Sequence, residues 1–220
     1  VTATNVNVNA GTSTFQDNLT ATTTTITTGT GNFNTVSGTT TSNLQFTDNG
    51  TANLNNGLTG NVTTTADNKG TLNLVGSNNQ TVTGTVGGVG ASLEKVSSGA
   101  TGATSTFVNN VYANTVENTG TGATTFQDNV TATNVNVNAG TSTFQDNLSA
   151  TTTTITTGTG NFNTVSGTTS SDIVFGADGV ANLNNGLTGD INFAGNNATV
   201  NVSDGKGILG SIETLATNNT

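Results

Sequence analysis

The chain has 220 residues, and Thr, Asn and Gly (53, 36 and 29 residues) make up more than half of it. Its net charge is −9, only 7% of its residues are charged, and His, Cys, Pro and Arg are absent. The three Lys (Lys69, Lys95 and Lys206) cannot line a nucleic-acid groove, and the lack of Cys excludes disulfides and thiolate metal sites. No apolar run approaches the ~20 residues of a membrane-spanning helix, so we expect no membrane insertion by this segment.

The chain opens with a 40-residue segment, 1–40, that returns as residues 130–169 with Thr20 replaced by Ser149 as the only change. A shorter repeat lies inside it, because Phe recurs at steps of 18 or 19 residues. Self-similarity on this scale is typical of stacked architectures, in which each unit buries its apolar side against its neighbours. We therefore predict a core stack of aromatic rings formed by Phe15, Phe33, Phe107, Phe126, Phe144 and Phe162.

Each short unit contains two clusters of apolar residues. After Phe126, they lie four, six, nine and eleven positions later, at Val130, Ala132, Val135 and Val137. A spacing of two within a cluster points alternate side chains inward from a strand. Asp-Asn, Thr-Asn and Asn-Ala-Gly between the clusters supply corners, because Asn and Gly tolerate turn conformations. The sequence therefore predicts three short strands in each turn.

The predicted fold class is all-β, a right-handed parallel β-helix (a β-solenoid) with rungs of about 18 residues. The many β-branched residues favour strand, and no Pro interrupts a ladder. A left-handed hexapeptide solenoid would need bulky apolar residues at positions 0, 6 and 12 of the unit, which this pattern does not supply. A row of Ig-like sandwiches would not explain the recurring Phe. Twelve or so rungs at about 4.8 Å each would form a rod of roughly 55–60 Å.

We expect one continuous body over residues 1–220. In this division, residues 1–96 and 130–215 are two copies of a long repeat, and residues 97–129 link them as further rungs. The chain begins at Val1 in the middle of a repeat, which predicts that it is a piece of a longer protein.

The second long copy is shorter than the first. LNLVGSNN (72–79) matches INFAGNNA (191–198) at an offset of 119 residues, whereas the preceding segments match at 129. SLEKV (92–96) then matches SIETL (211–215) at the same reduced offset. These offsets predict that the second copy has lost ten residues around NVTTTADNKG (61–70).

Residues 52–96 carry short phrases of a recognisable kind. G-x-L-x-L occurs at 70–74, T-x-T-G-x-x-G at 81–87, and the short apolar phrase SLEKV follows. This succession resembles the passenger regions of bacterial autotransporter adhesins, especially the rickettsial-type surface antigens. The resemblance implies a β-helical protein at the bacterial cell surface, with a role in adhesion or in a protective coat. A host-cell or matrix ligand is the partner that it implies.

The predicted function is that of a structural extracellular repeat protein: the shaft of an adhesin, a surface layer or a self-assembling filament. We expect neither an enzyme nor a cofactor. Because the open ends of a strand ladder pair readily with another chain, we also expect self-association, end to end or laterally.

Two alternatives remain open. A carbohydrate-active β-helix enzyme would need a pair of carboxylates, because no His or Cys is present. Asp17 and Asp146 recur only because the whole repeat was copied, and Tyr112 is the only aromatic residue with a polar handle. An ice-binding solenoid would need Thr in register on most rungs. The dense run TTTTITTGT occurs once in each long repeat, at 22–30 and 151–159.

Calcium is the one metal that the sequence brings into question. Four Asp lie in Gly-containing turns, and their carboxylate and backbone oxygens suit a hard cation. The G-G-x-G-x-D nonapeptide of calcium β-rolls and the EF-hand loop are both missing. Asp and Asn beside Gly are also good turn formers, so we expect plain turns, with calcium as the alternative. The candidates are Asp48, Asp67, Asp178 and Asp204.

Overall fold

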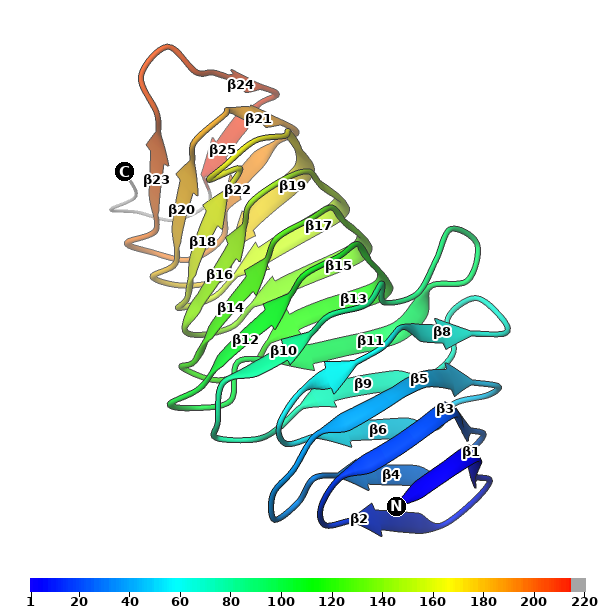
Figure 1. The fold of residues 1–220 in the computed structure, drawn as a ribbon. Coiled ribbons are helices and arrows are strands. Elements are labelled where there is room, and N and C mark those ends of the chain that lie inside the picture. Colours follow the sequence, from blue (N-terminus) through cyan, green and yellow to red (C-terminus); the bar gives the residue numbers. More distant parts are fainter. Residues whose placement is uncertain (215–220) are drawn as a thin grey trace.

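Figure 1 shows a computed structural model that describes residues 1–214 as one rising stack of strands. No residue in this range lies in a helix, and the strands pair in parallel with the strands of the turns before and after them. The predicted all-β parallel β-solenoid is confirmed. The match of SLEKV to SIETL ends at Leu215, which lies outside the described residues.

The strands form two long sheets, and each follows a path of eleven strands, one for each turn. The stack thus has eleven turns where twelve or so were expected. The 12-stranded sheet contains, in spatial order, β1 (Thr2–Val8), β3 (Leu19–Ile26), β5 (Thr40–Phe46), β7 (Leu58–Thr59), β10 (Gln80–Val82), β12 (Thr104–Phe107), β14 (Ala123–Phe126), β16 (Thr141–Phe144), β18 (Thr159–Phe162), β20 (Val180–Leu183) and β23 (Thr199–Val202), with β8 (Val62–Thr64) beside β5.

The 13-stranded sheet runs beside it over the same turns. It contains β2 (Thr12–Phe15), β4 (Thr30–Phe33), β6 (Thr51–Leu54), β9 (Thr71–Leu74), β11 (Leu93–Ser98), β13 (Val111–Asn118), β15 (Val130–Val137), β17 (Leu148–Ile155), β19 (Thr169–Phe175), β21 (Leu187–Thr188) and β24 (Ile208–Leu209), with β22 (Ile191–Phe193) and β25 (Ile212–Thr214) off this path.

A regular turn has two strands, not the three that the sequence predicts. In β15, Val130 and Val135 are buried, but Thr133 and Asn134 between them are both exposed. The inward-outward alternation therefore changes phase inside one continuous strand, which covers two faces of the core. The predicted Thr-Asn corner is a bend in this strand and does not end it.

Columns of inward-facing residues fill the core, and three of them, one on each face, are numbered below. Their members are paired Cα to Cα from one turn to the next. Column 1 contains Leu19, Thr40, Leu58, Val82, Phe107, Phe126, Phe144, Phe162, Leu183 and Val202. Column 2 contains Val6, Thr24, Leu44, Val62, Val86, Val111, Val130, Leu148 and Thr169. Column 3 contains Ser13, Gly31, Ala52, Leu72, Val96, Val116, Val135, Thr153, Ile173, Ile191 and Ile212.

The two copies of the 40-residue segment occupy different faces. Leu19 lies in column 1, but its copy Leu148 lies in column 2. Thr24 lies in column 2, and its copy Thr153 lies in column 3. The second copy is therefore rotated by one face about the solenoid axis.

The rotation persists beyond this segment. In the first copy β8 pairs with β5 through Leu44 and Val62, and in the second copy β22 pairs with β19 through Ile173 and Ile191. The second copy therefore keeps this strand, and the predicted loss of residues around 61–70 is wrong. Val62 lies in column 2 and its equivalent Ile191 in column 3.

Candidate functional site

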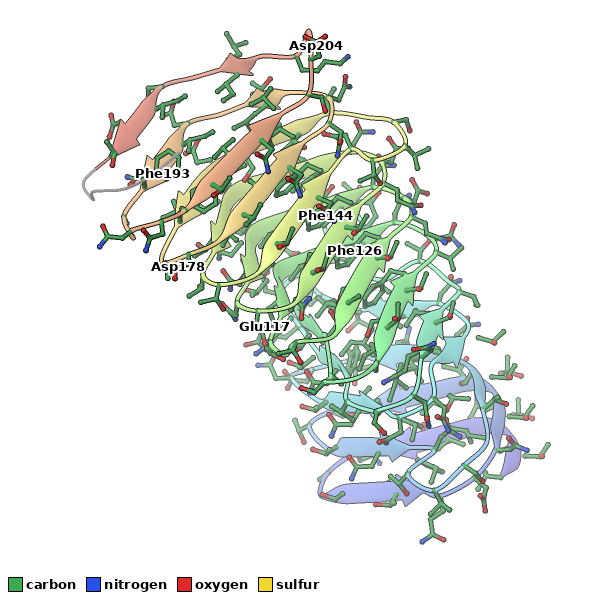
Figure 2. The ribbon with its side chains drawn as sticks, turned by 90° about the vertical axis from the view of Figure 1, so that its left-hand side faces the viewer. Glu117, Phe126, Phe144, Asp178, Phe193 and Asp204 are labelled. Carbon is green, nitrogen blue, oxygen red and sulfur yellow. The ribbon has the colours of Figure 1, made fainter. Side chains whose placement is uncertain are left out.

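The predicted Phe stack consists of two separate stacks. The rings of Phe15 and Phe33 lie 5.2 Å apart between centroids on β2 and β4. The longer stack is on column 1, where successive centroids are 5.1, 5.1 and 5.4 Å apart and the planes are within 7° of parallel. Figure 2 shows two of its members, Phe126 and Phe144, on neighbouring strands. The members of this longer stack are Phe107, Phe126, Phe144 and Phe162.

A third stack, made of two Phe rings, was not predicted from the sequence. The rings of Phe175 and Phe193 stack at 5.1 Å in the upper turns. Their spacing of 18 residues was a usable signal, but Phe175 follows Phe162 after 13 residues and so does not continue the series of 18 or 19. All of these rings except the partly exposed Phe15 are buried in the core.

The four calcium candidates do not come together as one group in the described part of the chain. Asp48 forms an ion pair with Lys69 at 3.0 Å, and Asp178 accepts a hydrogen bond from Asn197 at 3.5 Å. Figure 2 shows Asp178 and Asp204 at separate corners of the upper turns. Within residues 1–214 no three acidic side chains come together as a metal-binding group.

Two of these carboxylates fasten loops. The Lys69 ammonium donates a hydrogen bond to Asp48, and this contact is the main cause that lowers the pKa of Asp48. The Oδ1 atom of Asp67 accepts hydrogen bonds from the hydroxyl and the backbone N–H of Ser92, the latter at 2.9 Å. The bond from the Ser92 hydroxyl is the main cause that lowers the pKa of Asp67, and the bond from the Ser92 N–H is the second. Both side chains are therefore charged acceptors near neutral pH.

Three acids, Asp172, Asp190 and Glu213, lie in successive turns and line one shallow depression. Asp172 Oδ1 accepts a hydrogen bond from the backbone N–H of Asp190 at 3.0 Å. Asp190 Oδ1 accepts in turn from the N–H of Ser211 at 2.6 Å. In the first copy Asn43 and Asn61 occupy the equivalent positions, and the N–H of Asn61 is bonded to Asn43 Oδ1 at 3.0 Å. An amide fills the same role, so the carboxylates of Asp172 and Asp190 serve as acceptors that fasten corners.

Ladders of Asn amides run along the outside of the stack. The Nδ2 atom of Asn53 donates to Asn32 Oδ1 at 2.8 Å, and that of Asn73 donates to Asn53 Oδ1 at 2.9 Å. Asn182 and Asn201 continue an equivalent ladder in the second copy at 2.7 and 2.8 Å. Stacked amides add side-chain hydrogen bonds to the backbone ladder.

A hollow of about 340 Å³ lies beside the two loops that interrupt the regular turns. The first loop follows β8 and the second precedes β11, and Figure 1 shows both projecting beyond the strands. Strand alternation places the Tyr112 side chain on the outer face of β13, between two buried residues. The lining combines a carboxylate, an aromatic ring, hydroxyls and an apolar side chain: Asp67, Val89, Ser92, Tyr112, Thr131 and Thr133.

Hydrogen bonds hold the two loops in place. The backbone N–H of Asn68 donates to the carbonyl of Ser92 at 2.9 Å, which joins one loop to the other. Gly88 and Ala91 exchange two backbone hydrogen bonds of 3.0 and 3.1 Å across the tip of the second loop. Gly87 has φ +69°, and a Cβ there would lie 2.2 Å from the carbonyl oxygen of Tyr112. Only Gly therefore allows the loop to lie this close to Tyr112.

No family model, curated protein or solved structure matches this chain. None of the described residues forms a helix that could cross a bilayer.

Proposed function

We propose that the chain is a structural, extracellular β-solenoid that serves as the shaft of a bacterial surface adhesin, a surface layer or a filament. The observation that carries the proposal is the continuity of both sheets through eleven turns. In such a stack each turn covers the strand edges of the next, so the body resists bending and unfolding along its length. This function needs length and stiffness, and it needs no reactive group.

Side-chain contacts support the same mechanical role. Hydroxyl pairs bridge turns inside the core, with Thr24 Oγ1 and Ser42 Oγ 2.9 Å apart and Thr153 Oγ1 and Ser171 Oγ 2.8 Å apart. The Asn ladders do the same on the outside. Ring stacking, hydroxyl pairs and amides therefore fasten several of the turns to their neighbours in addition to the backbone.

Self-association and a host-cell or matrix ligand belong to this proposal. An unpaired strand edge is a template for another chain, and near-identical repeats allow a turn of one chain to pair with a turn of another. The resemblance of residues 52–96 to autotransporter passenger regions supports the placement at a cell surface.

Antibodies raised against this chain test the location. We expect them to label intact cells that make the protein, and labelling only after permeabilisation would contradict the proposal. Pulling the full chain from its two ends in a force experiment tests the mechanical role. We expect stepwise extension as single turns detach, and extension without measurable resistance would contradict a shaft.

Ice binding remains a second candidate because of one observation. Thr12, Thr30, Thr51 and Thr71 are paired in register on four successive turns, so Thr is aligned more widely than the dense runs indicate. The neighbouring row, however, changes from Thr14 to Asn after one turn. Thermal hysteresis of the purified chain decides the question, and its absence removes this candidate.

A further inference from the structure

We propose that the hollow beside Tyr112 binds a neutral saccharide. Its parts come from the places where the repeat is broken. Asp67 lies in the loop between β8 and β9, whose equivalent in the second copy, residues 194–198, contains no acidic residue, and Val89 lies in a Gly-rich loop. Tyr112 is the only Tyr in the chain. The repeat therefore builds this site once, whereas the ladders and corners occur in both copies.

The lining offers what a sugar ring needs. An aromatic face packs against the apolar C–H face of a sugar, and Tyr112 is the aromatic group here. Ser92 engages Oδ1 of Asp67 with two hydrogen bonds, which hold the carboxylate at the hollow. A carboxylate oxygen is a strong acceptor for sugar hydroxyls. The hydroxyls of Thr131 and Thr133 both donate and accept, as polyol recognition requires.

Size and charge narrow the ligand class. A hollow of about 340 Å³ is at the small end of ligand sites and suits one or two sugar rings. The Asp67 carboxylate and the net charge of −9 disfavour acidic sugars and phosphates. A quaternary ammonium is recognised by a cage of aromatic faces, and the hollow is lined by one aromatic residue only.

A row of hydroxyls continues from the hollow along the axis. Tyr112 is paired with Thr131, Thr131 with Ser149, and Ser149 with Ser170 in successive turns. The side chains of Thr131, Ser149 and Ser170 are exposed. Paired residues in adjacent strands are about 4.8 Å apart, so the row supplies closely spaced contacts for further sugar units. An oligosaccharide lying along the axis is therefore expected to bind more tightly than a monosaccharide.

The chain supplies its own probe for the test. Because it has one Tyr and no Trp, its tyrosine fluorescence reports on Tyr112 alone. The full chain is titrated with neutral gluco-, galacto- and manno-oligosaccharides, and separately with sialyllactose and tetramethylammonium. We expect a saturable change with at least one neutral oligosaccharide. A response to none of them, or a stronger response to sialyllactose or tetramethylammonium, would overturn the proposal.

Variants place the binding at this hollow. Asp67→Asn keeps an acceptor for Ser92 but removes the charged oxygen, so affinity is expected to fall roughly tenfold or more. Asp178→Asn, an exposed Asp at another corner, is the matched control and should bind as the parent chain does. Thr133→Val, at an exposed position, tests the hydroxyl contact if Asp67→Asn proves unstable in thermal melting. Parental affinity in both Asp67→Asn and Thr133→Val would refute the site.

Discussion

Asn34 and Thr40 close a corner of the solenoid from the inside. The hydroxyl of Thr40 donates a 2.5 Å hydrogen bond to Oδ1 of Asn34, and Nδ2 of Asn34 donates to the carbonyl of Asp17 at 2.9 Å. Asn34 is buried and has φ +55°, a left-handed conformation that Asn adopts more readily than most residues. One side chain thus ties the loop between β4 and β5 to the turn below.

Replacing Asn34 with Ala should lower the free energy of unfolding by about 1–3 kcal/mol, because it leaves the Thr40 hydroxyl and the Asp17 carbonyl without their partner. Asn34→Gly removes the same bonds but suits the positive φ, so it should cost less than Ala. Urea unfolding followed by circular dichroism measures both. Equal loss in the two variants would show that the backbone conformation contributes nothing at this corner.

Phe144 stands in the middle of the four-ring stack and is buried, whereas Phe15 is partly exposed. Phe144→Ala should therefore cost about 3–5 kcal/mol, through lost burial and the cavity left behind. Phe15→Ala is the matched control and should cost clearly less. Urea unfolding again provides the measurement. A similar cost for the two variants would contradict the different burial of the two rings.

Gly189 lies at a corner where no other residue fits. It has φ +144°, and a Cβ there would lie 2.2 Å from the backbone oxygen of Ser171. Gly189→Ala should lower the free energy of unfolding by an amount on the order of 1–3 kcal/mol, through backbone strain and a clash with main chain. Gly207→Ala, where a Cβ meets nothing within 4 Å, is the control. Thermal melting of the two variants side by side distinguishes them.

Asp190 makes part of the stability dependent on pH. Hydrogen bonds from the backbone N–H and then the hydroxyl of Ser211 lower its pKa below the usual 3.8. The contribution of these bonds is therefore complete above pH 3.8 and is lost as the pH falls through the lowered value. Asp190→Asn should flatten this acid limb in melts across low pH, because Asn61 fills the same role in the first copy. An unchanged acid limb would contradict the assignment; Asp204→Asn serves as the control for removing one exposed charge.

The candidate site was only partly predictable. Tyr112 was visible as the only Tyr, and Asp67 as a candidate for calcium. The sequence could not show that Ser92, 25 residues later, bonds to Asp67 or that both lie beside Tyr112. Turn lengths grow in this region, with Val82 paired to Phe107 across 25 residues. The regular repeat therefore gives no guide to which loop residues meet.

The recurrence of Phe and the two-residue apolar spacing were enough to determine a parallel stack with a Phe-lined core. Rings that recur once in each turn can pack on one another when the turns are stacked. The face on which each copy lies was decided only in the tertiary structure. Phe15 belongs to the 13-stranded sheet and its copy Phe144 to the 12-stranded sheet. The three columns accept the same residues, because Leu19 lies in column 1 and its copy Leu148 in column 2, and Thr24 lies in column 2 and its copy Thr153 in column 3. The local sequence pattern therefore suits all three faces equally well. The total length of the corners before a segment determines the face on which that segment lies.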